Sequence, residues 1–366
     1  MNTVYFIIMI FSFGMLFLVA LTPYLFALMA ALRGERMSAK GSTVERVTVI
    51  LPLFNEADYI IPKMDNIRDA VSHTQTPCEV LLGSDGSTDK TVEVVEQYIR
   101  QHNLKDWRIR AFPNEGKGQT LSKLVKESQG DLIISTDADV RMDKDAIALA
   151  VSLFEQDAKL GCLSSVPTFA LKSMRTQSLY WKEEMKVREA ESRMGKLIVV
   201  TGWLYAYRKA VYRDIPATAM ADDLWVPLTV LLQGYRVIHH AAFKAYSEET
   251  DEQTEIARRK RVISGGADIV RRLFGDLLKH PALFMTVFLH KINRWLLPVW
   301  FLLLVVSSLI YKPVWMWVYL GLLAVLALIL SPKRLWQLIR SVLTPVFAVF
   351  GMAGRKDLSK WEHTRI

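Results

Sequence analysis

The sequence predicts an α/β domain that is joined to membrane-spanning helices. Of the 366 residues, 51% are hydrophobic and 23% are charged, so apolar and charged residues are expected to occupy separate stretches. Between residues 45 and 265, short β-branched runs alternate with longer amphipathic stretches, which is the pattern of strands and helices around a sheet. Long apolar runs flank this region on both sides.

The first apolar run predicts a transmembrane helix over residues 1–32. It contains no Asp, Glu, Lys or Arg, and it exceeds the ~20 residues that cross the hydrocarbon core of a bilayer. A cleaved signal peptide is also apolar, but it begins with a basic segment, which this run lacks. We therefore expect a membrane anchor.

A second apolar stretch, residues 296–331, predicts a transmembrane hairpin. Its one charge is Lys312, which precedes Pro313, and this pair marks a short turn between two spans. The positive-inside rule then places the α/β domain in the cytoplasm, because basic residues follow the first and the last span, namely Arg33, Arg36, Lys333 and Arg334. We expect an integral protein of a bacterial inner (cell) membrane.

Two further segments are expected at the membrane surface. Residues 266–295 alternate basic and apolar positions, which is typical of an interfacial amphipathic helix. Residues 335–366 are interrupted by Arg340 and Pro345 and end in a basic tail, which favours an interfacial or re-entrant helix and a cytoplasmic tail. Basic flanks that contact anionic membrane lipids explain the net charge of +9, so we expect no nucleic-acid partner.

Within the α/β region, each predicted strand is followed by polar residues. Strands are predicted over 47–51, 79–83, 108–112 and 131–136, and helices over 57–72, 90–101 and 118–128. Ser87 is the predicted N-cap of the second helix. Because ligands bind beyond the carboxyl ends of the strands in such sheets, the polar clusters point to one site. Cys78 and Cys162 have neither disulfide-framework nor zinc-ligand spacing.

Two pairs of acidic residues are candidates for chemistry. Asp137 and Asp139 follow a predicted strand, where both carboxylates could face one divalent cation, although a solvated turn has the same composition. Asp222 and Asp223 precede an apolar stretch. They could cap a helix N-terminus, or one of them could be a general base aimed at an acceptor hydroxyl.

Three other segments could contact phosphate or a nucleoside. Residues 84–89 combine a carboxylate, a glycine and a helix start, and residues 114–118 place a lysine between two glycines; both could also be simple turns. Arg258 and Arg261 lie one helical turn apart, where they could neutralise a departing diphosphate or contact lipid.

Taken in this order, these segments resemble glycosyltransferase family 2, the inverting GT-A-like enzymes, and specifically the membrane-integrated branch related to cellulose and hyaluronan synthases. The resemblance covers nearly the whole chain, and it is carried by residues 49–56, 84–89, 114–117 and 137–139, by 201–202 with Arg208, and by 222–223. It implies a GT-A-like, Rossmann-like cytoplasmic domain with an N-terminal transmembrane helix, a C-terminal transmembrane hairpin and interfacial helices.

The resemblance also implies roles for particular residues. Asp223 would be the catalytic base, and Asp139 with Asp137 would hold Mg or Mn. Acceptor contacts would come from Gly202, Trp203 and Asp222. Donor contacts would come from Pro52, Asn55, Glu56, Asp85, Lys117, Asp137, Arg258 and Arg261.

The chain departs from the family pattern at two positions. Ser84 stands where the family often has a first acid, so only Asp85 is carried over as a nucleoside contact. Val262 stands where processive members have tryptophan after the second arginine, which leaves the phosphate role of Arg258 and Arg261 but puts polymer translocation in doubt.

The expected function is inverting transfer of a sugar from a nucleotide-sugar, by resemblance a UDP-sugar, to a hydroxyl of a lipid-linked or saccharide acceptor. Three alternatives remain open: a processive polysaccharide synthase, a polyprenyl-phosphate glycosyltransferase, and an inactive membrane scaffold that binds nucleotide-sugar. The identity of the sugar, the linkage position and the oligomeric state depend on features beyond these motifs.

Overall fold

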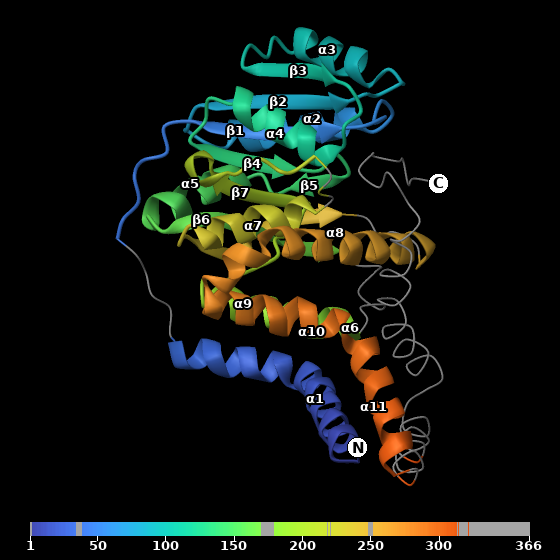
Figure 1. Cartoon of the computed structure of the whole chain (residues 1–366). Helices are drawn as coiled ribbons and strands as arrows, with labels where there is room; N and C mark the ends of the chain where they lie inside the picture. Colours follow the sequence, from blue (N-terminus) through green and yellow to red (C-terminus); the bar gives the residue numbers. More distant parts are fainter. Residues whose placement is uncertain are drawn as a thin grey trace.

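The computed structural model describes residues 2–33, 39–169, 179–217, 219, 221–247, 252–312, 314 and 321. A single eight-stranded sheet lies at one end of the molecule (Figure 1), with strand order β3-β2-β1-β4-β7-β6-β8-β5. Helix α8 lies below the sheet in this view, and helices α1 and α11 lie farthest from it.

The four predicted strands form the parallel half of the sheet. They are β3 (Trp107–Phe112), β2 (Cys78–Asp85), β1 (Val47–Leu53) and β4 (Leu132–Thr136), in that spatial order. The chain order reverses between β1 and β4, since β2 and β3 lie on one side of β1 and β4 on the other. Ligands of open α/β sheets bind at such a reversal, outside the carboxyl ends of the strands.

The other half of the sheet is mostly antiparallel. Strand β7 (Leu204–Arg208) runs antiparallel to β4, and β6 (Leu160–Phe169) runs antiparallel to β7. Strand β8 (Arg236–Ser247) is parallel to β6, and the short β5 (Val140–Met142) pairs with β8. Because β7 runs opposite to β4, the segment that enters β7 lies beside the segment that leaves β4.

Hydrophobic residues fill both faces of the sheet. Along β1, Ile50 belongs to one buried cluster, whereas Val49 and Leu51 belong to the other, as the two-residue period of a strand requires. The first cluster includes residues of α4 (Lys117–Glu127) and α7 (Asp222–Leu232), and the second includes residues of α2 (Ile60–Ser72), α3 (Thr91–Gln101) and α5 (Ala146–Gln156). Strands buried on both faces explain the continuous apolar runs in the sequence.

The start of α3 differs from the prediction. The helix begins at Thr91, and the carboxylate of Asp89 accepts a hydrogen bond from the Thr91 amide at 3.0 Å. Ser87 is therefore not the N-cap. Its hydroxyl lies earlier in the loop, where it accepts a hydrogen bond from the Asn55 amide at 3.1 Å. A tertiary contact between two loops takes the hydroxyl that local capping preferences would assign to the helix.

A series of helices leads into the second apolar stretch. It runs through α8 (Glu252–Leu278), α9 (Pro281–Val287), a π-helical turn over Phe288–Ile292, α10 (Asn293–Trp295) and α11 (Leu297–Tyr311). Helix α6 (Leu179–Arg193) precedes β7, with a single 3₁₀ turn at Lys209–Val211 after that strand. The predicted interfacial region, residues 266–295, therefore spans the end of α8 and three shorter helical segments.

Helix α1 (Asn2–Arg33) is the N-terminal apolar helix that the sequence predicts. Its segment Thr3–Leu32 is long and apolar enough to cross a membrane. An 18-residue stretch of this segment has a mean hydropathy of 2.6, and only 11% of that stretch is buried. The helix contains Pro23, and Figure 1 shows it bending, as an internal proline favours. One part lies alongside α11 and the other passes below α9 and α10.

The transmembrane hairpin stays a prediction. Segments Pro281–Trp295 and Leu297–Tyr311 qualify as a span only when taken together, and a bend of 63° separates them. Most of the second arm, after Lys312, and all of residues 335–366 lie outside the described residues.

Candidate active site

The loop after β1 is hydrogen-bonded to the loop after β2. Asn55 has a left-handed backbone conformation, with φ of 54°, and its side-chain oxygen accepts a hydrogen bond from the Thr88 amide at 2.8 Å. Asparagine tolerates this conformation better than most residues. The Glu56 amide donates to the Thr91 hydroxyl at 2.8 Å, and Pro52 is buried inside β1. The predicted donor-binding segments around Asn55 and Ser87 thus form one surface.

Asp85, at the end of β2, is fully buried and organises the next loop. Its carboxylate accepts hydrogen bonds from the amides of Glu115 and Gly116, each at 2.9 Å, and from the Thr120 hydroxyl at 3.1 Å. Gly116 adopts a φ of 93°, which favours glycine. The carboxylate thereby holds the start of α4, from which Lys117 projects, and any contact between Asp85 and a nucleoside has to share these bonds.

Lys117 brings the two acid pairs together. Its ammonium lies 2.8 Å from Oδ1 of Asp137, which follows β4, and 3.5 Å from Oδ2 of Asp222, which begins α7. Although burial opposes the shift, these two carboxylates raise the pKa of Lys117. Residues that are eighty-five positions apart in sequence therefore meet around one permanent positive charge.

Asp222 and Asp223 are in the first turn of α7, but neither is its N-cap. The cap is Ala221, and no side chain caps the helix. Asp222 is buried, and its carboxylate accepts a hydrogen bond from the Tyr205 hydroxyl at 2.8 Å. Asp223 is partly buried. Burial, followed by the charge of Asp222, raises the pKa of Asp223, and Lys117 opposes that shift.

The segment before β7 lies between the two acid pairs. The Trp203 carbonyl accepts hydrogen bonds from the Asp137 amide and the Thr136 hydroxyl, both at 3.1 Å. On the other side, a Cβ added to Gly202 would lie 3.6 Å from the Cβ of Asp223. The residues predicted to contact the acceptor are thus adjacent to the predicted base and to the Asp137–Asp139 turn.

The Asp137–Asp139 turn suits an oxygen-liganded divalent cation. Asp139 is exposed, and burial raises the pKa of Asp137, with Asp139 adding to that shift and Lys117 opposing it. Carboxylate oxygens are the ligands that Mg²⁺ and Mn²⁺ favour. In the part of the chain that is described, no group of three or more His, Cys, Asp or Glu side chains could hold a metal ion.

A buried ionic cluster links helix α6 and the segment before β7 to the helices that precede α11. The carboxylate of Glu184, in α6, lies 2.6 Å from Arg294 and 3.0 Å from Lys291. Arg188, one turn after Glu184, also pairs with it at 3.4 Å and reaches the Thr201 hydroxyl at 3.4 Å. His290, on the π-helical turn and fully buried, bridges Glu184 and Glu191 at 3.0 and 2.7 Å. π-Helical turns often occur at functional sites.

Some predicted residues are not brought to this site by any described contact. Arg258 and Arg261 lie in α8, but their side chains are outside the described residues. Arg208 instead donates hydrogen bonds to the carbonyls of Phe154 and Asp157, at 2.6 and 3.0 Å, and so secures the end of α5. Arginine side chains commonly bind the last carbonyls of a helix in this way.

Sequence reasoning missed Lys63. This α2 lysine is 2% exposed, and its ammonium donates to the Thr136 hydroxyl at 2.7 Å and to the Val140 carbonyl at 2.6 Å. A signal was present, because Ile60 and Ile67 define the apolar face of the helix and Lys63 falls on the same face.

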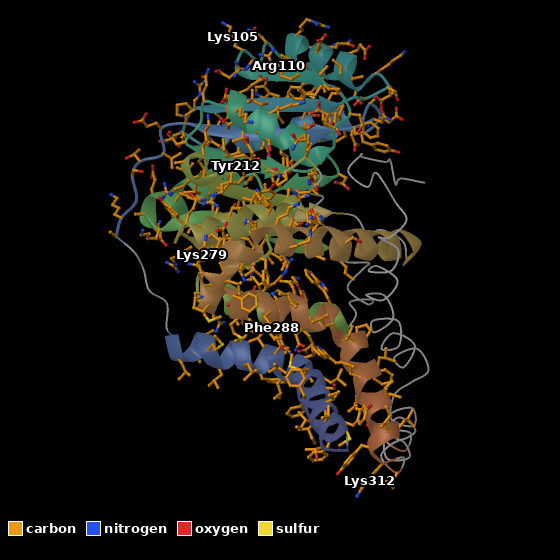
Figure 2. The ribbon with its side chains drawn as sticks, viewed as in Figure 1. Lys105, Arg110, Tyr212, Lys279, Phe288 and Lys312 are labelled. Atoms are coloured by element: carbon orange, nitrogen blue, oxygen red, sulfur yellow. The ribbon has the colours of Figure 1, made fainter. Side chains whose placement is uncertain are left out.

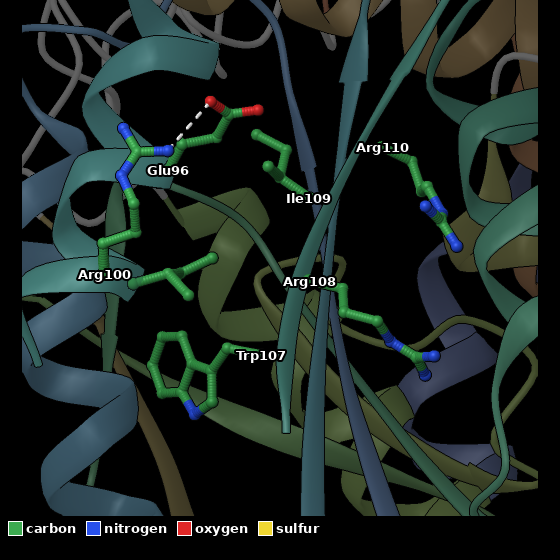
Figure 3. Close-up of a pocket in the computed structure, with 7 residues that line it drawn as sticks. Glu96, Arg100, Trp107, Arg108, Ile109 and Arg110 are labelled. Carbon is green, nitrogen blue, oxygen red and sulfur yellow. Dashed lines mark hydrogen bonds and ion pairs between the residues drawn. The ribbon is translucent and has the colours of Figure 1, made fainter. Parts of the chain in front are cut away.

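A cavity of about 290 Å³ lies beside the edge strand β3, away from the acid pairs (Figure 3). Its arginines pair with nearby carboxylates, Arg100 with Glu96 at 3.4 Å and Arg110 with Glu127 at 2.8 Å. Figure 2 shows Lys105 and Arg110 at the end of the molecule farthest from Phe288 and Lys312. This cavity is separate from the acid pairs, and its charges are neutralised locally.

Comparison with known proteins agrees with this architecture. The sequence model of glycosyl transferase family 2 matches residues 48–216, which include β1 to β4 and β7. This chain carries a family 2 glycosyltransferase domain. The match includes Asp85, Lys117 and the Asp137–Asp139 turn, and it ends before Asp222 and Asp223.

Curated relatives of this chain include two polysaccharide synthases. It is 20% identical over 263 residues to the poly-beta-1,6-N-acetyl-D-glucosamine synthase of Staphylococcus epidermidis, covering 70% of this chain and 63% of the relative. It is 23% identical over 244 residues to the protein of the same name from Staphylococcus aureus strain MSSA476, covering 64% of this chain and 58% of the relative. The match therefore leaves more than a third of each relative uncovered.

A solved structure with the same fold is the mannosyltransferase PcManGT from Pyrobaculum calidifontis, in complex with GDP-Man and Mn²⁺. It superposes with a TM-score of 0.71 at 23% sequence identity and covers 97% of this chain and 99% of the other. The likeness confirms the predicted GT-A-like fold of the family 2 domain.

Proposed function

We propose that this protein is an inverting, metal-dependent membrane glycosyltransferase. It transfers a sugar from a nucleotide-sugar, with a UDP-sugar as the expected donor, to a hydroxyl of a lipid-linked or saccharide acceptor. The observation that carries the proposal is the position of Lys117, whose ammonium lies 2.8 Å from Asp137 and 3.5 Å from Asp222. One cation thereby joins the end of the nucleotide-binding half of the sheet to the acid pair of α7.

The reaction is a single displacement at the anomeric carbon. The acceptor oxygen forms the new bond to that carbon while its proton passes to the carboxylate of Asp223. The bond between the anomeric carbon and the phosphate oxygen breaks, and the nucleoside diphosphate leaves with the electron pair. One displacement inverts the configuration. The raised pKa of Asp223 supports its role, because a base works best when its pKa approaches the working pH.

The chain's own residues stabilise the leaving group and orient the acceptor. Lys117 supplies a positive charge beside the departing diphosphate, and Arg258 and Arg261 are proposed to add theirs from α8. A Mg²⁺ or Mn²⁺ ion held by Asp139 and Asp137 would neutralise diphosphate charge when bound. Gly202 leaves space beside Asp223 for the acceptor hydroxyl, with Trp203 next to it.

The apolar helix α1 supports placement at a membrane, and the basic residues Arg33 and Arg36 after it support a catalytic domain on the cytoplasmic side. Nucleotide-sugars are soluble, so a cytoplasmic site next to the bilayer could use a soluble donor and a lipid-linked acceptor. Direct contact with membrane lipids through α1 and the helices after α8 is part of this proposal.

A second candidate is a processive polysaccharide synthase, which the names of the two staphylococcal relatives favour. It would use the same acid pairs and Lys117. Val262, in place of the tryptophan of processive members, argues against it. Measuring product length separates the two, since a single-addition enzyme extends its acceptor by one sugar.

The proposal is tested with a panel of nucleotide-sugars and the purified full-length protein, reading out released nucleoside diphosphate. We expect release with at least one donor in Mg²⁺ or Mn²⁺ and none in EDTA. Asp223→Asn serves as the matched control because it leaves the donor surface intact. Full turnover in EDTA contradicts the metal-dependent mechanism, and no turnover with any donor would favour a nucleotide-sugar-binding scaffold.

A further inference from the structure

Lys63 lies beneath the turn that carries Asp137 and Asp139. Its ammonium donates to the Thr136 hydroxyl, just before the turn, at 2.7 Å, and to the Val140 carbonyl, just after it, at 2.6 Å. The side chain therefore bridges the two ends of the turn from the protein side, while the carboxylate of Asp139 lies on the exposed side.

The same chain of hydrogen bonds reaches the segment before β7, which carries Trp203. The Thr136 hydroxyl that accepts from Lys63 donates to the Trp203 carbonyl at 3.1 Å. That carbonyl also accepts from the Asp137 amide at 3.1 Å. Lys63 thus fixes a junction at which the end of β4, the acid-bearing turn and the entry to β7 meet.

Packing alone does not explain a lysine at this position. Burying an ammonium group costs several kcal/mol unless opposite charges and hydrogen bonds compensate for it. Burial lowers the pKa of Lys63 to about 7, and the charges of Asp137 and Asp139 oppose that shift. The neighbouring apolar residues of α2, such as Ile60 and Met64, show that an apolar side chain would suit this face.

We propose that Lys63 is a positioning residue that preorganises the Asp137–Asp139 turn for the divalent cation and the nucleotide diphosphate. It contacts neither of them. Its two hydrogen bonds fix the separation of Thr136 and Val140, and hence the direction of both carboxylates. In its protonated form, the ammonium reduces their mutual repulsion when no cation is bound. This inference rests on the proposed function, which assigns the cation to these two aspartates.

Asn66 provides a matched control within the same helix. It is also buried, and it also makes two hydrogen bonds to the neighbouring strand, from its amide to the Met142 carbonyl and from the Met142 amide to its oxygen, each at 2.8 Å. These bonds hold β5 beyond the turn and involve neither Thr136 nor Val140. Loss of Asn66 therefore measures the general cost of weakening the contact between α2 and β5.

The experiment measures the Kd of UDP by calorimetry at a series of fixed Mn²⁺ concentrations, with full-length protein in detergent micelles. Lys63→Met keeps the length of the side chain but removes the charge and both donors. Because residues that support metal ligands typically change affinity by about 10- to 100-fold, we expect a loss of that size. Asn66→Leu is expected to lower the Tm at least as much while leaving the Mn²⁺ dependence within about twofold of the wild type, since Lys63 still holds the turn.

Thr136→Val covers the case in which Lys63→Met does not fold. It is nearly isosteric, leaves Lys63 bonded to Val140, and is expected to weaken Mn²⁺-dependent UDP binding by a smaller factor. In a transfer assay, either variant should require more Mn²⁺ for half-maximal rate, with a much smaller change in the rate at saturating Mn²⁺. A residue with a purely structural role would not raise the Mn²⁺ requirement while leaving the rate at saturating Mn²⁺ nearly unchanged.

Two results contradict the account, and they are distinguishable. If folded Lys63→Met or Thr136→Val shows the Mn²⁺ dependence of the wild type, and Asp139→Asn still abolishes the Mn²⁺ effect, the positioning role of Lys63 is wrong although the metal site stands. Mn²⁺-independent UDP binding in the wild type and in Asp139→Asn alike overturns the proposed metal site, and the inference fails with it.

Discussion

The two acid pairs have the same charges but different structural settings. Asp137 and Asp139 lie on a turn between strands, where Asp139 is exposed. Asp222 and Asp223 begin helix α7, where Asp222 is buried and accepts a hydrogen bond from the Tyr205 hydroxyl. An exposed carboxylate on a turn is accessible to a ligand that arrives with the donor. A partly buried carboxylate with a raised pKa suits proton transfer.

Lys117 is the residue that both pairs share, and in the proposed mechanism it couples their two roles. Its charge stabilises the ionised form of each pair, so a diphosphate that attracts the ammonium also alters the field at Asp223. The division of labour can be tested by changing one pair and measuring the function assigned to the other.

The largest effect is expected from Asp223→Asn, which removes the proposed base. Transfer should slow by a factor on the order of 100 to 10,000, the usual contribution of general acid–base catalysis. Since Asp223 is not the N-cap of α7, helix capping gives no reason for a change in rate. Transfer at a near wild-type rate in a steady-state assay would refute the base assignment.

Asp139→Asn should act on binding. It removes a proposed metal ligand, and since partners that merely support ligands already change affinity by about 10- to 100-fold, we expect at least about 100-fold weaker Mn²⁺-dependent UDP binding. The strand β4 is unchanged, so the thermal transition without ligand should persist. Calorimetry with and without EDTA checks this, and retention of the Mn²⁺ effect would remove the distinction between the pairs.

The pH dependence of transfer should depend on Asp222. Burial, and then the charge of Asp222, raise the pKa of Asp223. Because the base must be ionised to accept a proton, the transfer rate should fall as the pH is lowered through this pKa, at a higher pH than for an ordinary aspartate. Asp222→Asn removes the like charge and should move this acid limb to lower pH. The kcat/KM profile of both proteins measures it, and an unmoved limb would mean that Asp222 does not act on Asp223.

The smallest effect expected is on stability. A carboxyl group whose pKa is raised in the folded state destabilises the fold once it ionises, so stability falls as pH rises from the unfolded value of 3.8 through the folded pKa. Asp223→Asn lacks that ionisation and should have a higher Tm than the wild type at pH 7. The difference in Tm should vanish below pH 3.8. A lower Tm for Asp223→Asn than for the wild type at pH 7 would contradict the claim that the ionised Asp223 destabilises the fold.

The parallel half of the sheet was predictable from the sequence, because its strands are local apolar runs followed by polar loops. The buried runs at β1 and β4 fixed those elements, and the polar residues after them pointed to one edge of the sheet. Ser87 was misassigned because its hydroxyl bonds across to Asn55, and local capping preference contains no information about a partner 32 residues away.

The mostly antiparallel half of the sheet was less predictable because it depends on pairings between distant segments. The antiparallel pairing of β7 with β4 brings the Trp203 carbonyl to Asp137, and no local periodicity specifies that register. The helical period placed Lys63 on the buried face of α2, but it could not reveal its acceptors, which lie 73 and 77 residues away. Only the family resemblance connected Asp137 with Asp223, and geometry supplied Lys117 as the link between their two pairs.

The central claim, that the two acid pairs divide binding and proton transfer between them, is tested most directly by one binding isotherm. The Kd of UDP in the presence of Mn²⁺ should be measured for Asp223→Asn beside the wild type and Asp139→Asn. The account predicts wild-type affinity for Asp223→Asn, because its carboxylate is not part of the metal turn. Weakening as large as that of Asp139→Asn would contradict the division of labour.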